Sequence, residues 1–190
     1  MTSAVHTLLL VDDEPAILAA LRRTLRGESY RILTTSDPTE VLGILERERV
    51  DLLVSDIDMP QMSGVELVAQ VRRAHPDVVR ILLTGRGSLD TALRAINDGE
   101  VYRYLQKPWD DTEIRETIFQ AIQRLEELRR AAAASRASAR RKALLDELER
   151  EHPGILDVSL IDGRYVITKH RLAELSRRVR EPELRALLAE

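Results

Sequence analysis

The sequence contains no cysteine, only one phenylalanine and one tryptophan, and no hydrophobic run long enough to cross a bilayer. The lack of cysteine excludes disulfide bonds and thiolate metal sites, and it agrees with a reducing cytoplasm. A membrane-spanning helix needs roughly 18 consecutive apolar residues. Residues 1–6 also lack the basic start and apolar stretch of a signal peptide. We therefore expect a cytoplasmic protein with no membrane segment.

Charge is unevenly distributed along the 190 residues, although the net charge is only −3. Residues 1–120 hold 14 basic and 20 acidic side chains, whereas residues 121–190 hold 15 basic and 12 acidic ones. This asymmetry predicts two regions with separate roles. It does not by itself indicate a nucleic-acid partner.

Short apolar runs alternate with amphipathic stretches over the first 110 residues. The runs are too short for helices and have the length of buried strands. The expected strands cover residues 7–11, 30–35, 52–56, 79–84 and 102–106. The expected helices begin near Pro15, Asp37, Ser63, Leu89 and Asp110. Five β–α units predict an α/β fold, with a five-stranded parallel sheet covered by helices on both faces.

A helical pattern continues from Asp111 beyond the point where a compact domain would end. Its centre, Arg129 to Lys142, holds six basic and no acidic residues and is rich in alanine, a strong helix former. A long helix is stable in water mainly when its apolar stripe packs on another surface. We therefore predict a homodimer through the helix after residue 111. The basic run lacks interleaved aromatics, so nucleic-acid binding is a weaker alternative, as in a DNA-binding transcriptional regulator.

The pattern changes again after His152-Pro153-Gly154, where Asp162-Gly163 predicts a hairpin and short helices follow. Fewer than 40 residues remain, too few for an independent core. We expect three parts: residues 1–124 as the main domain, 125–152 as a helical linker or coiled coil, and 153–190 as a small interaction module. An alternative is that this tail begins a larger output enzyme, although no catalytic motif is visible in it.

Polar residues end the predicted strands, where ligands bind in open α/β sheets. Asp12 and Asp13 follow the first strand, Asp56 ends the third, Thr84 ends the fourth, and Lys107 follows the fifth. Three neighbouring carboxylates stay ionised together only beside a cation, and oxygen ligands favour Mg²⁺. An aspartate beside Mg²⁺ can attack a phosphoryl group, while an ammonium and a hydroxyl stabilise the phosphoryl oxygens.

Residues 6 to about 124 resemble the receiver domain of bacterial two-component response regulators, whose fold is flavodoxin-like. The motifs that carry the resemblance are Val11-Asp12-Asp13-Glu14-Pro15, Asp56-Ile57-Asp58-Met59-Pro60 with Gly64, Thr84-Gly85, and Tyr102 to Pro108. The resemblance implies a regulatory domain that accepts a phosphoryl group from a sensor histidine kinase. It catalyses only its own phosphorylation and dephosphorylation and is otherwise no enzyme. The downstream target is not implied.

Individual roles follow from the same resemblance. Asp56 is the expected phospho-acceptor, and Lys107 the expected contact to the phosphoryl group. Asp12, Asp13, Asp56 and the backbone carbonyl of Asp58 are the expected Mg²⁺ site, with Asp13 as a direct ligand. Thr84 and Tyr104 match the pair that switches conformation. The Lys107–Pro108 bond is expected to be cis.

Another alternative comes from Asp56-Ile57-Asp58, which resembles the nucleophile motif of haloacid-dehalogenase-type phosphatases. That motif normally opens the first strand of its domain, whereas here it ends the third and is followed by Met59-Pro60. Turnover of a small phosphate ester would support the phosphatase. A single stoichiometric phosphorylation would support the receiver domain.

Overall fold

The computed structural model describes residues 5–85, 101–151, 159–161 and 164–166. The chain divides into two compact units, Met1–Arg129 and Arg130–Glu190. The strands are β1 (His6–Val11), β2 (Tyr30–Thr35), β3 (Leu52–Asp56), β4 (Val79–Thr84), β5 (Arg103–Gln106), β6 (Ser159–Ile161) and β7 (Arg164–Val166). The helices are α1 (Pro15–Thr24), the 3-10 turn η1 (Pro38–Glu40), α2 (Val41–Arg47), α3 (Gly64–Ala74) and α5 (Asp111–Glu151).

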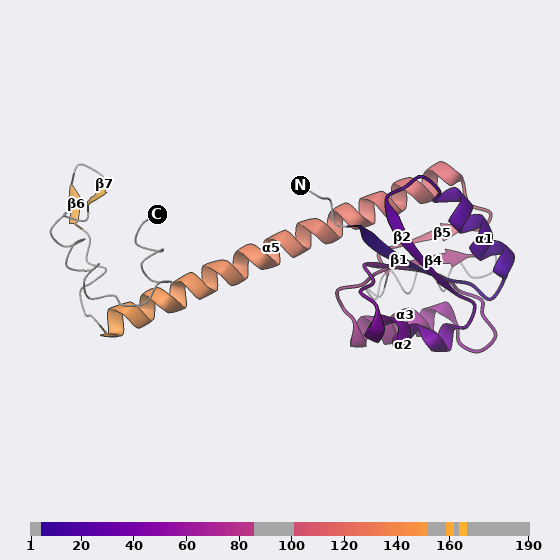
Figure 1. Ribbon diagram of the computed structural model, residues 1–190, viewed down its shortest axis with the longest axis horizontal. Coiled ribbons are helices and arrows are strands. Elements are labelled where there is room, and N and C mark those ends of the chain that lie inside the picture. Colours follow the sequence, from indigo (N-terminus) through magenta and orange to yellow (C-terminus); the bar gives the residue numbers. More distant parts are fainter. Residues whose placement is uncertain (1–4, 86–100, 152–158, 162–163, 167–190) are drawn as a thin grey trace. The chain divides into compact units, whose positions relative to one another are not determined.

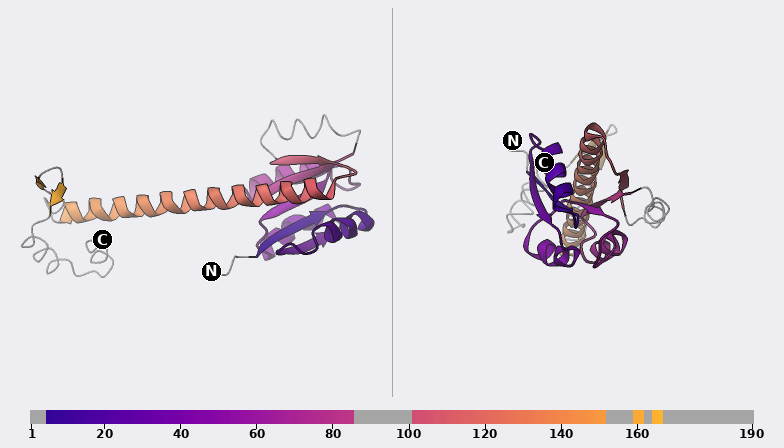
Figure 2. Two further views of the ribbon diagram at one scale, coloured as in Figure 1. Left: turned by 90° about the horizontal axis from the view of Figure 1, so that it is seen from above. Right: turned by 90° about the vertical axis from the view of Figure 1, so that its right-hand side faces the viewer.

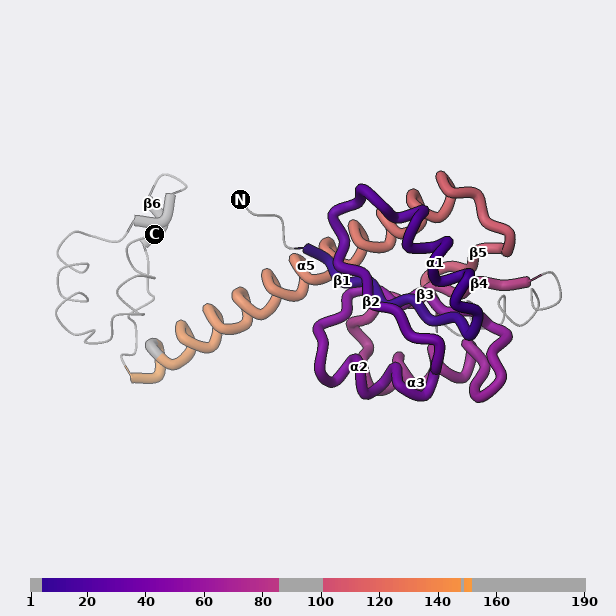
Figure 3. The backbone as a smooth tube through the Cα atoms, turned by 45° about the vertical axis from the view of Figure 1, so that its right-hand side comes forward, coloured from indigo at the N-terminus to yellow at the C-terminus, as the bar shows by residue number. Residues whose placement is uncertain are grey.

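The first unit is built on a five-stranded parallel sheet in the order β2-β1-β3-β4-β5. Figure 3 traces the backbone through these strands. The predicted flavodoxin-like α/β class is therefore confirmed. The strands β1 and β3 are neighbours, and their ladder ends with Val11 opposite Ser55. The residues that follow, Asp12 and Asp56, consequently emerge side by side at the carboxyl edge of the sheet.

Both faces of the sheet are covered by helices, as Figures 1 and 2 show. On one face α2 and α3 pack against Leu9, Leu53 and Leu82. On the other, α1 and the first part of α5 pack against strand residues that include Leu8, Leu10, Leu52, Val54, Ile81, Leu83 and Leu105. Successive strand residues alternate between these two cores because strand side chains point to opposite faces. Burial on both faces explains why the strands are continuous apolar runs.

The helix α3 begins with a capping box. The Ser63 hydroxyl accepts a hydrogen bond from the Glu66 amide at 3.2 Å, and the Glu66 carboxylate accepts one from the Ser63 amide at 3.1 Å. These bonds satisfy amides that the first turn of a helix leaves without partners. The cap therefore fixes where the chain after β3 turns into α3.

The structure differs from the sequence prediction at the second helix. A single helix was expected from Asp37-Pro38, but the chain first makes the 3-10 turn η1, and α2 begins only at Val41. The Asp37 carboxylate accepts hydrogen bonds from the amide and hydroxyl of Thr39, at 2.8 and 2.6 Å. This local bond favours a tight turn over a regular first helical turn.

The predicted continuation of the last helix is borne out, because α5 is one helix from Asp111 to Glu151. Its first part is anchored in the core by Ile114, Ile118 and Ile122, whereas residues 130–143 are exposed throughout.

The strands β6 and β7 pair antiparallel, as the hairpin signal predicted. The helices expected near residues 89–99 and after residue 170 lie outside the described residues. No helix in the described part of the chain is long and apolar enough to span a membrane.

Candidate functional site

Three acids gather at the carboxyl edge of the sheet. Asp12 is fully buried, Asp56 is 5% exposed, and Asp13 is half-buried. One carboxylate oxygen from each lies within 4.8 Å of the others. The parallel pairing of β1 with β3 produces this arrangement, since it aligns the ends of the two strands. The prediction that these acids meet at one edge is therefore correct.

Lys107 reaches the same point from the end of β5. Its Nζ lies 2.7 Å from Asp12 Oδ2 and 2.7 Å from Asp56 Oδ1. Its backbone amide donates to the Thr84 carbonyl at 2.7 Å, and the Lys107–Pro108 peptide bond that follows is cis. The backbone bond ties the lysine to the end of β4, so the ammonium is held between the two buried acids.

Electrostatics at this edge are dominated by excess negative charge. Burial raises the pKa of Asp56, the Asp12 charge adds to this, and the hydrogen bond from Lys107 opposes the increase without cancelling it. For Lys107, burial acts to lower the pKa, but its bonds to Asp12 and Asp56 raise it above the ordinary value. Three carboxylates and one ammonium sum to −2 when all are ionised. A divalent cation would balance that charge, and the all-oxygen donor set is one that Mg²⁺ accepts.

Thr84 and Tyr104 lie on the neighbouring strands β4 and β5. Thr84 is fully buried, and its hydroxyl donates to the Gly85 carbonyl at 2.9 Å. Tyr104 is half-buried against the α2–α3 core and is the ladder partner of Leu82, two residues before Thr84. Because side chains two residues apart in a strand share a face, Thr84 and Tyr104 both point to the α2–α3 side. The switching role predicted for Thr84 and Tyr104 requires that both side chains lie on the same face of the sheet.

Gly64 shows a constraint whose size only the structure reveals. Its amide donates to the Ile57 carbonyl at 2.9 Å, so the start of α3 lies directly against the end of β3. A Cβ at this position would lie 1.9 Å from the backbone oxygen of Asp56. The sequence indicated Gly64 only as part of a motif.

Asp58 is exposed, with its side chain near Gly85, and the role of its backbone carbonyl stays a prediction.

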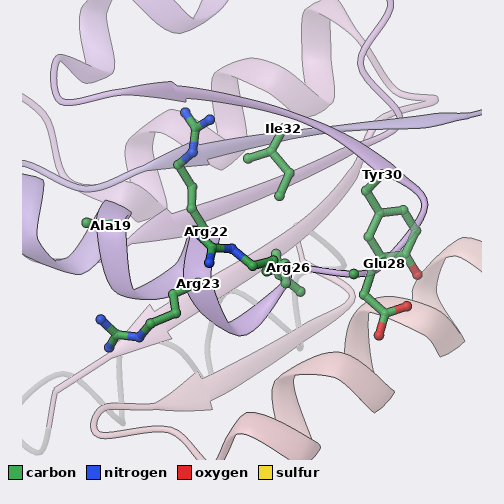
Figure 4. A pocket seen from close by; sticks show the side chains of 9 residues that line it. Ala19, Arg22, Arg23, Arg26, Glu28, Tyr30 and Ile32 are labelled. Carbon is green, nitrogen blue, oxygen red and sulfur yellow. The ribbon is translucent and has the colours of Figure 1, made fainter.

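A pocket of about 620 Å³ lies elsewhere, between the second half of α1 and the start of β2 (Figure 4). Arg22, Arg23, Arg26, Tyr30 and Ile32 are among its lining residues. Neither Lys107 nor any of the three clustered acids Asp12, Asp13 and Asp56 lines it. The chemistry-bearing residues therefore occupy a separate site at the opposite end of the strands.

A family model for the response regulator receiver domain matches residues 8–119, which include all of these site residues. The chain belongs to this family. A solved receiver domain of an HD domain-containing protein from Pseudomonas fluorescens is 38% identical, with a TM-score of 0.64, and the match covers 68% of this chain and 96% of that one. Membership in the receiver family favours the regulatory interpretation of Asp56-Ile57-Asp58 over the phosphatase alternative.

Curated relatives are longer proteins. The hydrogenase transcriptional regulatory protein HoxA of Cupriavidus necator is 36% identical over 123 residues, which cover 65% of this chain and 25% of the relative. The DNA-binding transcriptional regulator NtrC of Klebsiella pneumoniae is 33% identical over 155 residues, covering 82% of this chain and 32% of the relative. The chain thus matches a quarter to a third of the length of these relatives.

Proposed function

We propose that Asp56 accepts a phosphoryl group from a sensor histidine kinase. A carboxylate oxygen of Asp56 forms the new bond to phosphorus while the phosphorus–nitrogen bond of the phosphohistidine breaks, and the imidazole leaves. The observation that supports this assignment is the contact of Lys107 with both Asp12 and Asp56 at 2.7 Å, beside the Asp13 carboxylate. The kinase itself is inferred from family membership.

The residues around Asp56 have distinct roles in this proposal. Lys107 already lies against the Asp56 oxygen, so its ammonium can neutralise charge on the transferred phosphoryl oxygens. The Thr84 hydroxyl, which donates to the neighbouring Gly85 carbonyl, can turn to donate to a phosphoryl oxygen instead. That movement vacates space on the side where Tyr104 is half-buried, and Tyr104 can turn inward. Asp12, Asp13, Asp56 and the Asp58 carbonyl would hold Mg²⁺, which supplies positive charge to the phosphoryl oxygens.

Phosphate incorporation tests the assignment. The full chain is incubated with Mg²⁺ and a small phosphodonor, and intact-mass spectrometry counts the phosphoryl groups. We expect one group on the wild type, one on Asp77→Asn, and none on Asp56→Asn. Asp77→Asn is a matched control because it makes the same substitution at an exposed aspartate outside the acceptor site. Unchanged labelling of Asp56→Asn would remove the assignment.

We also propose that the signal leaves through α5 as a change in self-association. Residues 130–143 of this helix are exposed, and Phe119 and Leu128 are large apolar side chains that are 57% and 51% exposed. A helix of this length gains stability when such side chains pack on a second copy. Sedimentation velocity with and without beryllofluoride tests this. A dimer that forms only with beryllofluoride, and not in Asp56→Asn, is the expected result.

DNA binding is the second candidate, favoured by the names of the relatives, which are transcriptional regulators. The exposed stretch of α5 carries Arg136, Arg141 and Lys142, which could contact phosphates. This candidate predicts affinity for duplex DNA that falls with salt, with a slope of roughly one unit per phosphate contact. Salt-independent or absent binding would eliminate it.

A further inference from the structure

An ionic cluster lies at the edge of the sheet opposite to the acceptor acids. It consists of His6 at the start of β1, Asp51 just before β3, and Glu126 and Arg129 on α5. Asp51 Oδ1 pairs with Arg129 Nη1 at 2.5 Å, and Asp51 Oδ2 lies 3.3 Å from His6 Nδ1. The other ring nitrogen of His6 lies 3.1 Å from Glu126 Oε1. These four side chains, here termed the ionic latch, join two strands to one helix.

Asp51 is the centre of the ionic latch. Its side chain is only 7% exposed, and its Oδ2 also accepts a hydrogen bond from the Thr7 amide at 3.0 Å. Burial acts to raise the pKa of Asp51, but the bonds from Arg129 and from the Thr7 amide outweigh it, and the pKa is lowered. The carboxylate is therefore ionised and held in place by β1, with one oxygen directed at α5.

His6 lies between two carboxylates. An ionised carboxylate only accepts hydrogen bonds, so both ring nitrogens can bond at once only if both carry a proton. The geometry thus requires the imidazolium form for the complete set of contacts. In that form two cations and two anions sum to zero charge. A neutral His6 would keep one of its two bonds and leave the cluster with a net negative charge.

The ionic latch lies on α5 just beyond the point where burial of the helix in the core ends. Burial of α5 in the core ends at Leu125, and none of the described residues from 126 to 147 is buried. The turn from Glu126 to Arg129 is therefore held by polar contacts to the rest of the first compact unit, Met1–Arg129, here called the receiver unit. Leu128 in this turn is half-exposed. The first compact unit ends at Arg129 itself. The ionic latch thus attaches the last turn of α5 that belongs to this unit.

We propose that the ionic latch is a proton-dependent fastening of α5 to the receiver unit. It holds when His6 is protonated and loosens as the pH rises. The charged groups facing His6 are Asp51 from the start of β3 and Glu126 from α5, with Arg129 bound to the far oxygen of Asp51. Because β1 and β3 carry Asp12 and Asp56 at their other ends, roughly 17 Å away along the strands, the fastening is separate from the acceptor site.

Hydrogen exchange of the full chain, followed by mass spectrometry, tests this proposal without a kinase or phosphate. We expect Arg129→Gln to speed exchange of amides 125–131 by about tenfold, since it removes a hydrogen bond to a charged group. The matched control is Arg124→Gln on the same helix, whose pair with Glu127 is exposed and contributes little. Unchanged exchange in peptides from β3 shows that each variant is folded.

A pH series isolates the role of His6. After correction for intrinsic exchange rates, protection of residues 125–131 in the wild type should fall several-fold as the pH of the series is raised. His6→Gln, which carries no titrating ring, should show no such fall. Equal protection of Arg129→Gln and wild type, or the same pH dependence in His6→Gln, would overturn the proposal.

Discussion

Replacement of Gly64 by alanine should displace the end of β3, which carries Asp56, because the added methyl group would clash with its backbone. The added Cβ would lie 1.9 Å from the backbone carbonyl oxygen of Asp56 and 2.8 Å from its backbone carbonyl carbon. Real contacts of this kind stay at or beyond 3.0 Å, so the start of α3 and the end of β3 must separate by about 1.1 Å (3.0 minus 1.9). The obstacle is backbone on both sides, so no side chain can rotate away.

The expected change in the free energy of unfolding of Gly64→Ala follows from two opposing effects. Overpacking of a rigid site costs about 1–3 kcal/mol, and a backbone obstacle places this substitution at the upper end. Alanine in place of glycine in a helix gains up to about 1 kcal/mol. We therefore expect Gly64→Ala to lower the free energy of unfolding by about 2 kcal/mol. It should also weaken Mg²⁺ binding, because a shift of the Asp56 backbone moves the carboxylate that would hold the ion.

Gly43→Ala provides the matched control. Gly43 lies within α2, and a Cβ there would meet only the flexible end of the Arg47 side chain, at 3.3 Å. This variant should be equally stable or up to about 1 kcal/mol more stable than the wild type. Urea denaturation of the full chain, monitored by fluorescence of Trp109, measures all three proteins. A Gly64→Ala protein as stable as Gly43→Ala would refute the argument from close approach.

Three further predictions concern charge at the acceptor edge. Mg²⁺ should raise the denaturation midpoint of the wild type by mass action, and Asp13→Asn should remove most of that gain. Without Mg²⁺, the raised pKa of Asp56 contributes stability that is fully present below the ordinary carboxyl pKa and lost as pH rises through the folded value. The difference in stability between the wild type and Asp56→Asn should therefore decline from about pH 4 upward, and saturating Mg²⁺ should flatten that decline; a difference that rises with pH would contradict the assignment. Lys107→Met, which leaves buried acids without their cation, should lower stability at neutral pH by about 3 kcal/mol, as chemical denaturation in EDTA would show.

Much of the site was predictable because its parts are local in sequence. Asp12-Asp13, Asp56 and Lys107 each follow an apolar run, and parallel strands bring their carboxyl ends to one edge whatever the loops between them do. Register, by contrast, is a long-range property. The alignment of Val11 with Ser55, which places Asp12 beside Asp56, follows from packing on both faces of the sheet.

The ionic latch was not predicted. In the sequence His6 has no metal-ligand or catalytic spacing to another histidine, and Asp51, Glu126 and Arg129 resemble ordinary charged residues at a loop and on a helix face. The sequence separations within the cluster are 45, 120 and 78 residues. No periodicity in the sequence links positions so far apart. They meet because α5 crosses the sheet face toward the amino ends of β1 and β3.

The sequence by itself determined the alternation of strands and helices, the acids at the strand ends and the continuity of the last helix, because these depend on neighbouring residues and on hydrophobic periodicity. Only the tertiary structure decided which oxygen of Asp12 and Asp56 contacts Lys107, why residue 64 has to be glycine, and which side chains meet in the ionic latch. Those outcomes depend on distances between segments remote in sequence, which are set by the packing of helices on the sheet.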